Sequence, residues 1–264
     1  MRIILPTFAK LNLTLRVINK RSDGYHNIVS TFLKIPSGDV LYISESTARI
    51  DVVNANIPIK GENIIIKALR IAREEGFKIP YLNVKIQKSI PPGSGLGAGS
   101  GNAAAVLWWL GAERVAAKVG ADVPFLCSGF NMAVVSGIGD HIEAAKSAAP
   151  HGVIAIPDWQ TDTTSAYKEL DAMGYEGFDT LLARTEMRDM YHANAGKKVG
   201  LLPNDFLKVL IRAHPKYNEL FKIFENAGAD AWGLTGSGSA AFGVFNSAPK
   251  LIKWPGYIKN VLYF

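Results

Sequence analysis

The segment Pro91-Pro92-Gly93-Ser94-Gly95-Leu96-Gly97-Ala98-Gly99-Ser100-Gly101-Asn102 is the most informative stretch of this 264-residue sequence. Its five glycines alternate with mostly small residues, and an alanine-rich helix is expected to begin near Ser100. Such a backbone can turn its N–H groups towards a ligand, and a helix N-terminus attracts negative charge. The segment therefore predicts a phosphate-binding loop. A flexible linker is the alternative, but linkers rarely stand between an apolar strand and an apolar helix.

The glycine segment matches one of two known nucleotide-binding patterns. No G-x-x-x-x-G-K-[ST] spacing occurs in the sequence, so the segment is not a Walker A loop. Residues 99–104 match G-x-G-x-x-A, a variant of the dinucleotide fingerprint, which leaves a nicotinamide-dependent oxidoreductase as an alternative. That fingerprint requires a strand directly before the first glycine and a repeating β-α-β series, whereas a long glycine-rich stretch precedes residue 99 here.

Apolar periodicity on both sides of the glycine segment predicts an α+β fold. Turn-rich stretches separate the N-terminal strands, which indicates an antiparallel sheet, and Asn63 is the expected N-cap of a helix that ends at Gly76. The pattern breaks near residue 150, so two domains are expected, 1–149 and 150–264. The expected strands are 11–17, 28–35, 40–44, 50–53, 82–86, 132–136, 153–156, 231–234 and 240–245, and the later helices are 164–173, 178–190, 206–213 and 215–227.

The composition favours an ordered globular protein with an anionic small-molecule ligand. Hydrophobic residues make up 48% of the chain and charged residues 20%, which excludes the low-apolar, high-charge composition of disorder. Lys and Arg outnumber Asp and Glu by 29 to 23, so the formal charge is +6. Because these cations are scattered and form no basic arm, a phosphorylated small molecule is expected as the partner, and nucleic acid is not.

Cysteine content and apolar runs predict a cytoplasmic protein. Cys127 is the only cysteine, so no disulfide within the chain and no cysteine-based metal site can form. No signal-peptide pattern follows the N-terminus. The longest apolar segment, 103–110, is far shorter than the roughly 20 residues that a membrane-spanning helix needs. We therefore expect neither export nor membrane insertion.

Three polar groups outside the glycine segment are candidates for chemistry. Lys10 and Asn12 share one face if residues 9–13 form an alternating strand, although a lone lysine on a strand is usually solvent-facing. Tyr25 and His26 follow a turn and would, taken alone, be ordinary turn-edge residues. Asp122 precedes Pro124 and is either a helix N-cap or a general base. Phosphoryl transfer to an alcohol requires such a carboxylate to accept the hydroxyl proton.

Together these segments resemble the GHMP kinase superfamily. The resemblance is carried by the phosphate loop at 92–100 and by Thr235-Gly236-Ser237-Gly238 near the C-terminus. Within the superfamily, residues 9–13, 20–26 and 120–125 resemble the branch that phosphorylates 4-diphosphocytidyl-2-C-methyl-D-erythritol in non-mevalonate isoprenoid synthesis. The resemblance spans nearly the whole chain. It implies a two-domain GHMP kinase fold with antiparallel and mixed sheets, with the phosphate loop and the catalytic residues in domain 1–149.

The resemblance implies an ATP-dependent kinase that acts on the 2-hydroxyl of that cytidine-bearing alcohol. Asp122 would be the catalytic base, and the Lys10 ammonium beside it would keep the carboxylate ionised. Tyr25 would stack on the cytosine ring, His26 would hydrogen-bond its edge, and Tyr167 would supply a second ring. Stacking of this kind contributes about 1–3 kcal/mol per base. The implied substrate-binding residues are Asn12, Tyr25, His26, Thr163 and Tyr167.

The same resemblance implies ATP and nucleotide-bound Mg²⁺ as cofactors and a monomer or homodimer. Other GHMP kinases, acting on homoserine, mevalonate or a sugar, are alternatives, as is a catalytically silent nucleotide-binding module. Ala98 and Gly101 depart from the family's loop, in which a glycine and a serine are usual, so one hydroxyl near the phosphates is missing. The implied ATP-binding residues are Asn63, Lys88, Pro92, Gly93, Ser94, Gly95, Leu96, Gly97, Ala98, Gly99, Ser100, Gly101, Asn102, Gly236, Ser237 and Gly238.

Overall fold

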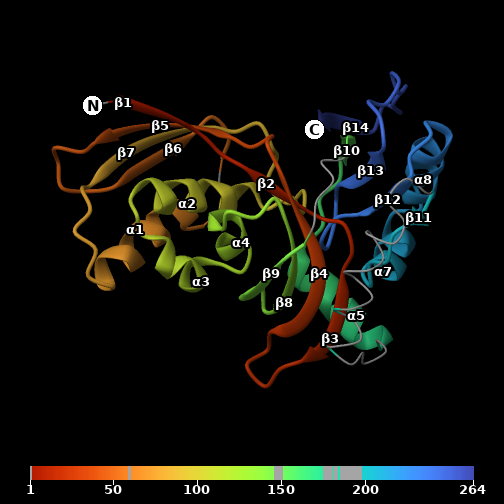
Figure 1. The fold of residues 1–264 in the computed structure, drawn as a ribbon, viewed down its shortest axis with the longest axis horizontal. Coiled ribbons are helices and arrows are strands. Elements are labelled where there is room, and N and C mark those ends of the chain that lie inside the picture. The colour runs from red at the N-terminus through yellow and green to blue at the C-terminus, as the bar shows by residue number, and fades with distance from the viewer. Residues whose placement is uncertain (1, 59–60, 146–150, 175–179, 181–183, 185–197) are drawn as a thin grey trace. The chain divides into compact units, whose positions relative to one another are not determined.

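The computed structural model describes residues 2–58, 61–145, 151–174, 180, 184 and 198–264, and the chain forms two compact units (Figure 1). The α+β class with antiparallel and mixed sheets is confirmed. The predicted division at residue 149 does not coincide with the compact units, because strand β4 pairs with β8 and joins early residues to later ones. The first unit contains Met1–Lys10, Lys34–Pro92 and Gly97–Gly129, and the second contains Leu11–Leu33, Gly93–Leu96 and Phe130–Phe264.

The first unit is built on a four-stranded sheet in the order β1-β5-β7-β6. Strand β6 runs parallel to β7, and the other neighbours are antiparallel, so the sheet is mixed and not purely antiparallel as predicted. The first strand was not predicted, because Pro6 ends its short apolar run. The strands are β1 (Arg2–Pro6), β5 (Val40–Glu45), β6 (Val52–Ala55) and β7 (Leu82–Gln87).

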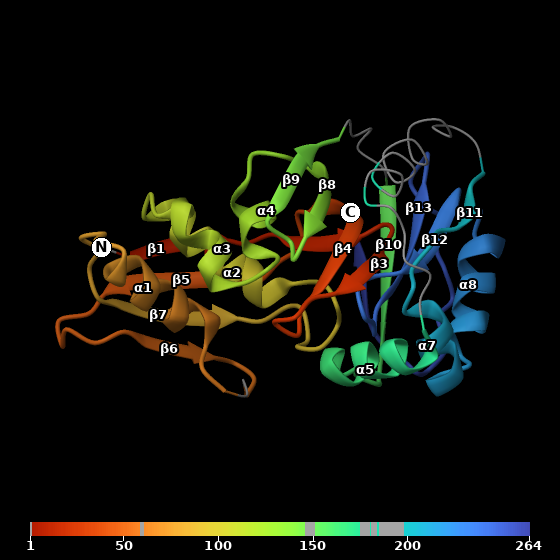
Figure 2. The same ribbon diagram turned by 90° about the horizontal axis from the view of Figure 1, so that it is seen from below.

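Helices cover one face of this sheet (Figure 2). Helix α1 (Ile64–Glu74) begins as predicted, because the Asn63 side chain accepts a hydrogen bond from the Ile65 N–H. Apolar side chains of α1 and of α2 (Ala98–Trp109) pack with inward-facing side chains of β5 and β7, which together form the core of the unit. The remaining short helices are η1 (Glu113–Val115), α3 (Ala116–Val119) and α4 (Val123–Cys127).

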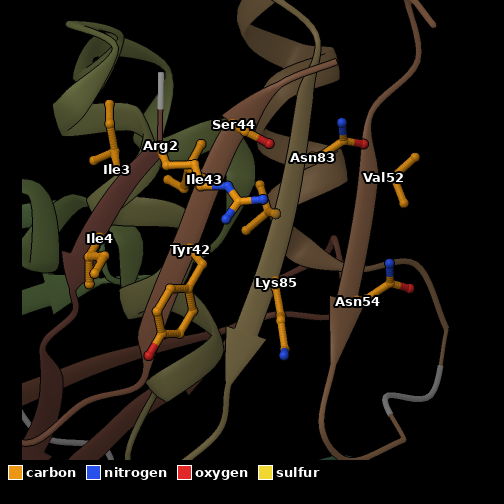
Figure 3. Close-up of a pocket in the computed structure, with 11 residues that line it drawn as sticks. Arg2, Ile3, Ile4, Tyr42, Ile43, Ser44, Val52, Asn54, Asn83 and Lys85 are labelled. Carbon is orange, nitrogen blue, oxygen red and sulfur yellow. The ribbon is translucent and has the colours of Figure 1, made fainter. Parts of the chain in front are cut away.

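The opposite face of the sheet carries a shallow pocket (Figure 3). Successive side chains of a strand point to opposite faces of the sheet. Ile43 therefore points into the core, whereas Tyr42, which is 40% exposed, lies on the outer face. Figure 3 shows Tyr42, Lys85 and Asn54 projecting from three neighbouring strands. The pocket therefore lies on the face that α1 and α2 do not cover.

The second unit has a five-stranded sheet in the order β11-β12-β13-β10-β14, and α8 packs against its central strands β12 and β13. No helix in the described part of the chain is both long and apolar enough to cross a membrane. The predicted helix 178–190 falls mainly outside the described residues. The elements are β10 (His151–Pro157), β11 (Gly200–Leu201), β12 (Ala231–Leu234), β13 (Ala241–Phe245), β14 (Ile258–Tyr263), α5 (Thr163–Met173), α7 (Leu207–Ala213) and α8 (Tyr217–Asn226).

The chain also forms a third sheet, in the order β2-β4-β8-β9 with β3 paired to β4. The predicted single strand 11–17 is wrong in this sheet. That run forms two strands, because the Leu13 N–H bonds to Thr31 whereas the Leu15 N–H bonds to Pro203, which breaks the pairing with β4. All four residues of β2 are buried, so both of its faces are covered. The strands are β2 (Ala9–Asn12), β3 (Arg16–Lys20), β4 (His26–Ile35), β8 (Met132–Gly137) and β9 (His141–Ala144).

Close packing leaves no room for a side chain at Gly101. A Cβ atom at this position would lie 1.8 Å from the backbone oxygen of Phe8, far inside van der Waals contact. The first turns of α2 therefore touch the segment that leads into β2. Any side chain at position 101 would force these two segments apart.

We predict that Gly101→Ser destabilises the protein by about 1–3 kcal/mol, the usual cost of overpacking a close contact. Gly129→Ala is the matched control in the same unit, because nothing lies within 4 Å of a Cβ atom there. The free energy of unfolding in urea would measure both variants. Equal stability of the two variants would contradict the close contact.

Candidate active site

Lys10 and Asp122 form an ion pair within the first unit. Strand β2 carries the lysine, whose side chain is only 7% exposed, and its Nζ lies 3.7 Å from Oδ2 of the aspartate. Asp122 occupies the N-cap position of α4, yet its side chain makes no capping hydrogen bond. Asp122 is thus the N-cap of α4 by position, as one of the two interpretations held, but its side chain is not used for capping. Its carboxylate, 26% exposed, faces the lysine and solvent instead.

The glycine segment passes directly beside this ion pair. Gly97 has a φ of +62°, and a Cβ atom there would lie 2.9 Å from Oδ2 of Asp122 and 3.0 Å from Cγ of Lys10. Gly97 is also the N-cap of α2 and offers no side chain to cap the first N–H groups of that helix. Uncapped N–H groups, a helix N-terminus and a nearby ammonium together suit an anion such as a phosphate.

Strand β7 ends at Gln87, and α2 begins only at Ala98, so no strand leads directly into Gly99. The arrangement therefore lacks the strand–turn–helix context of a dinucleotide fingerprint. Among the described residues, no group of three or more His, Cys, Asp or Glu side chains could hold a metal ion.

Three predicted nucleotide-binding side chains of this unit are engaged with the protein itself. The Asn63 side chain caps α1. The Lys88 ammonium is paired with Asp39, and the Asn102 amide donates to the same carboxylate. Asp39, which was not singled out from the sequence, thus connects two of the predicted residues.

The second unit holds the start of the glycine segment against the late glycine turn. Backbone N–H groups of Ser239 and Ala240 donate to the carbonyl oxygens of Gly93 and Ser94, at 3.4 and 3.1 Å. A Cβ atom at Gly95 would lie 2.6 Å from the oxygen of Gly238, so the two turns are in direct contact. The late glycine turn, whose residues 236–238 were predicted to bind ATP, therefore contacts the start of the glycine segment.

Two predicted substrate residues contact this late turn. The hydroxyl groups of Thr163 and Ser237 are 2.8 Å apart, and the Asn12 N–H donates to Oγ1 of Thr235 at 2.9 Å. The Asn12 side chain donates to Ser30 at 2.8 Å. The turn at 235–239 is thus linked to α5 and to β2.

His26 and Tyr167 form a stacked pair, with ring centroids 4.4 Å apart. Asp171 accepts from Nε2 of His26 at 2.8 Å and from the Lys20 ammonium at 2.7 Å. Burial raises the pKa of Asp171, but the hydrogen bonds from Lys20 and His26 outweigh it and hold that pKa below its ordinary value. Tyr25, by contrast, is 64% exposed.

Asp171 was not predicted from the sequence, although one signal could have indicated it. It lies four residues after Tyr167 on α5, and residues at this spacing share one face of a helix. Because Asp171 lies one helical turn after Tyr167, both side chains can contact His26.

Two family models match the chain. The model described as "GHMP kinases N terminal domain" matches residues 63–130, which include the glycine segment and Asp122. The model described as "GHMP kinases C terminal" matches residues 185–253, which include the late glycine turn.

Individual relatives agree over nearly the full length. A 4-diphosphocytidyl-2-C-methyl-D-erythritol kinase of Caldanaerobacter subterraneus subsp. tengcongensis is 30% identical, with 100% of this chain and 95% of the relative covered. One from Porphyromonas gingivalis is 33% identical over 95% of this chain and 94% of the relative. A crystal structure of 4-(cytidine 5'-diphospho)-2C-methyl-D-erythritol kinase is similar with a TM-score of 0.72 and 26% identity, covering 92% of this chain and 90% of that one. A homoserine kinase from Cytophaga hutchinsonii, with a TM-score of 0.64 and 15% identity over 93% of this chain and 85% of that one, shares the fold.

Proposed function

Because the chain belongs to the 4-diphosphocytidyl-2-C-methyl-D-erythritol kinase family of GHMP kinases, we propose that it transfers the γ-phosphoryl group of ATP to the 2-hydroxyl of that alcohol. The observation that carries the proposal is the Lys10–Asp122 pair, 3.7 Å apart, with Gly97 packed against both side chains. A base, a cation and a glycine loop are the parts that phosphoryl transfer to an alcohol needs.

In the proposed reaction the Asp122 carboxylate accepts the proton of the substrate's 2-hydroxyl. The hydroxyl oxygen forms a bond to the γ-phosphorus while the bond from that phosphorus to the β–γ bridging oxygen breaks, and ADP leaves. The Lys10 ammonium, 3.7 Å from Asp122, offsets negative charge at the reacting oxygens. A base has to be partly accessible to reach a hydroxyl, and the Asp122 side chain is 26% exposed.

We assign the phosphates of ATP to the backbone of the glycine segment and to the N-terminus of α2. Left-handed glycines at positions 93, 95 and 97 allow this backbone to turn, and no side chain caps α2. Mg²⁺ would be bound through nucleotide oxygens and water, where it would neutralise phosphate charge. We assign no protein side chain to the metal.

The cytidine group is assigned to residues of the second unit. His26 is held by Asp171, whose Oδ1 lies 2.8 Å from Nε2 of its ring, and we assign this ring to the polar edge of the cytosine. Tyr167 and Tyr25 offer aromatic faces for stacking, and Asn12 and Thr163 offer polar groups to the rest of the substrate.

We predict that Asp122→Asn lowers kcat by at least about 100-fold, the usual contribution of a general base. Asp140→Asn is the control, because it removes an exposed turn carboxylate from the same chain and should leave kcat unchanged. ADP release under saturating ATP would measure both. Full turnover by the Asp122 variant would remove this residue from its assigned role.

We predict that only the cytidine-bearing substrate supports turnover by the wild-type protein. ADP release would be compared with 4-diphosphocytidyl-2-C-methyl-D-erythritol, homoserine and mevalonate side by side. Turnover with homoserine or mevalonate instead would point to another GHMP activity. Absence of any substrate-dependent ADP release would contradict the kinase proposal itself.

We predict that Tyr167→Leu raises KM for the cytidine substrate at least about fivefold, because a stacking contact contributes about 1–3 kcal/mol per base. KM for ATP should not change. Tyr42→Leu, on the outer face of the first unit's sheet, is the matched control and should alter neither KM. Equal effects on both KM values would argue against a role for Tyr167 in binding the base.

A further inference from the structure

Asp39 is a fully buried carboxylate, and the reaction proposed above gives it no part. It precedes β5 and its side chain has 0% exposure. An ionised carboxylate so deeply buried is rare and requires several hydrogen-bond or ionic partners. The identity of these partners shows what the residue holds in place.

Three partners lie immediately before the glycine segment. Nζ of Lys88 is 2.5 Å from Oδ2 of Asp39, and the backbone N–H groups of Ser89 and Ile90 donate to Oδ1 at 2.8 and 3.4 Å. These three residues are consecutive, and Pro91 follows them. Asp39 therefore binds the residues that connect the end of β7 to the glycine segment.

The fourth partner lies immediately after the glycine segment. Nδ2 of Asn102, in the first turns of α2, donates to Oδ2 of Asp39 at 2.8 Å. Thr7 completes the cluster: its hydroxyl lies 3.1 Å from Oδ1 of Asn102 and accepts from the Asp39 N–H at 2.9 Å. The Asp39 carboxylate thus joins both ends of residues 91–101, and Thr7 connects this cluster to the segment that leads to Lys10.

We infer that Asp39 is a positioning residue that fixes the two ends of the phosphate-binding loop and so sets the affinity of the protein for ATP. The inference rests on the proposed function. A glycine-rich loop loses much conformational freedom when it orders around a ligand, and fixing both ends beforehand reduces that loss. Lys88 acts through Asp39 in this arrangement, because its ammonium is buried against that carboxylate.

The same unit contains a matched ion pair that does not touch the loop. Asp51, with a side chain 9% exposed, accepts from Nη1 and Nη2 of Arg73 at 2.6 and 3.0 Å and from the Leu82 N–H at 2.9 Å. It connects α1 to the start of β7, whereas Asp39 connects the end of β7 to α2. Asp51→Asn therefore removes a comparable buried carboxylate at a site that is not part of the loop.

The test compares Asp39→Asn with Asp51→Asn in the full-length protein. Asp39→Asn should raise KM for ATP at least about fivefold, equal to about 1 kcal/mol at 25 °C, with KM for the alcohol unchanged. The rise in Tm on adding ADP should be smaller in this variant than in the wild type. Asp51→Asn should lower Tm without changing KM for ATP. An unchanged KM in Asp39→Asn, or an equal change in both variants, overturns the inference.

A double variant covers the case in which Asp39→Asn leaves Lys88 as a lone buried cation and does not fold. Asp39→Asn with Lys88→Met removes both charges, which is often tolerated in a protein interior. Its KM for ATP should also rise at least about fivefold above that of the wild type, because both residues act through one link. An unchanged KM in the double variant overturns the inference. Where Asp39→Asn does fold, a larger rise in the double variant than in the single one would place Lys88 in direct contact with the nucleotide and contradict this role. Wild-type protein without ATP-dependent turnover would instead contradict the proposed function.

Discussion

The close approach of Gly97 to the Lys10–Asp122 pair is the contact on which the proposed chemistry depends. Three separate segments, β2, the start of α2 and the start of α4, meet at one point where a Cβ atom would lie 2.9 Å from the carboxylate. Only a residue without a side chain and with a left-handed backbone fits there. The geometry therefore places the N-terminus of α2 in van der Waals contact with the ion pair within a single compact unit.

Local features of the sequence predicted the parts of this arrangement that short-range chemistry decides. Asn63 caps α1, the strands at 40–44 and 82–86 form, and the glycine segment enters a helix, since each depends on neighbours a few residues away. Asp39 and Asp171 were missed as functional candidates because their partners lie up to 63 and 151 residues away along the chain. The interleaving of the two units was missed for the same reason, since it follows from the pairing of β4 with β8.

The predicted nucleotide residues divide into backbone and side-chain roles that the sequence alone does not separate. Asn63, Lys88 and Asn102 use their side chains to cap a helix and to hold Asp39, so these side chains build the loop's surroundings. The glycines between them offer backbone N–H groups and, at positions 93, 95 and 97, left-handed turns. Hydrogen bonding therefore separates the two groups, because three side chains are engaged within the protein and the proposed ATP contacts fall to the glycine backbone.

The departure at Gly101 illustrates how packing and binding act on the same residues. A serine there would supply a hydroxyl, but its Cβ atom would lie 1.8 Å from the Phe8 oxygen. With glycine at position 101, α2 instead packs directly against the segment that carries Lys10. Close packing at this point keeps the N-terminus of α2 near the ammonium. Because the α2 N-terminus and the Lys10 ammonium both favour negative charge, their proximity supports the proposed phosphate site without a hydroxyl at position 101.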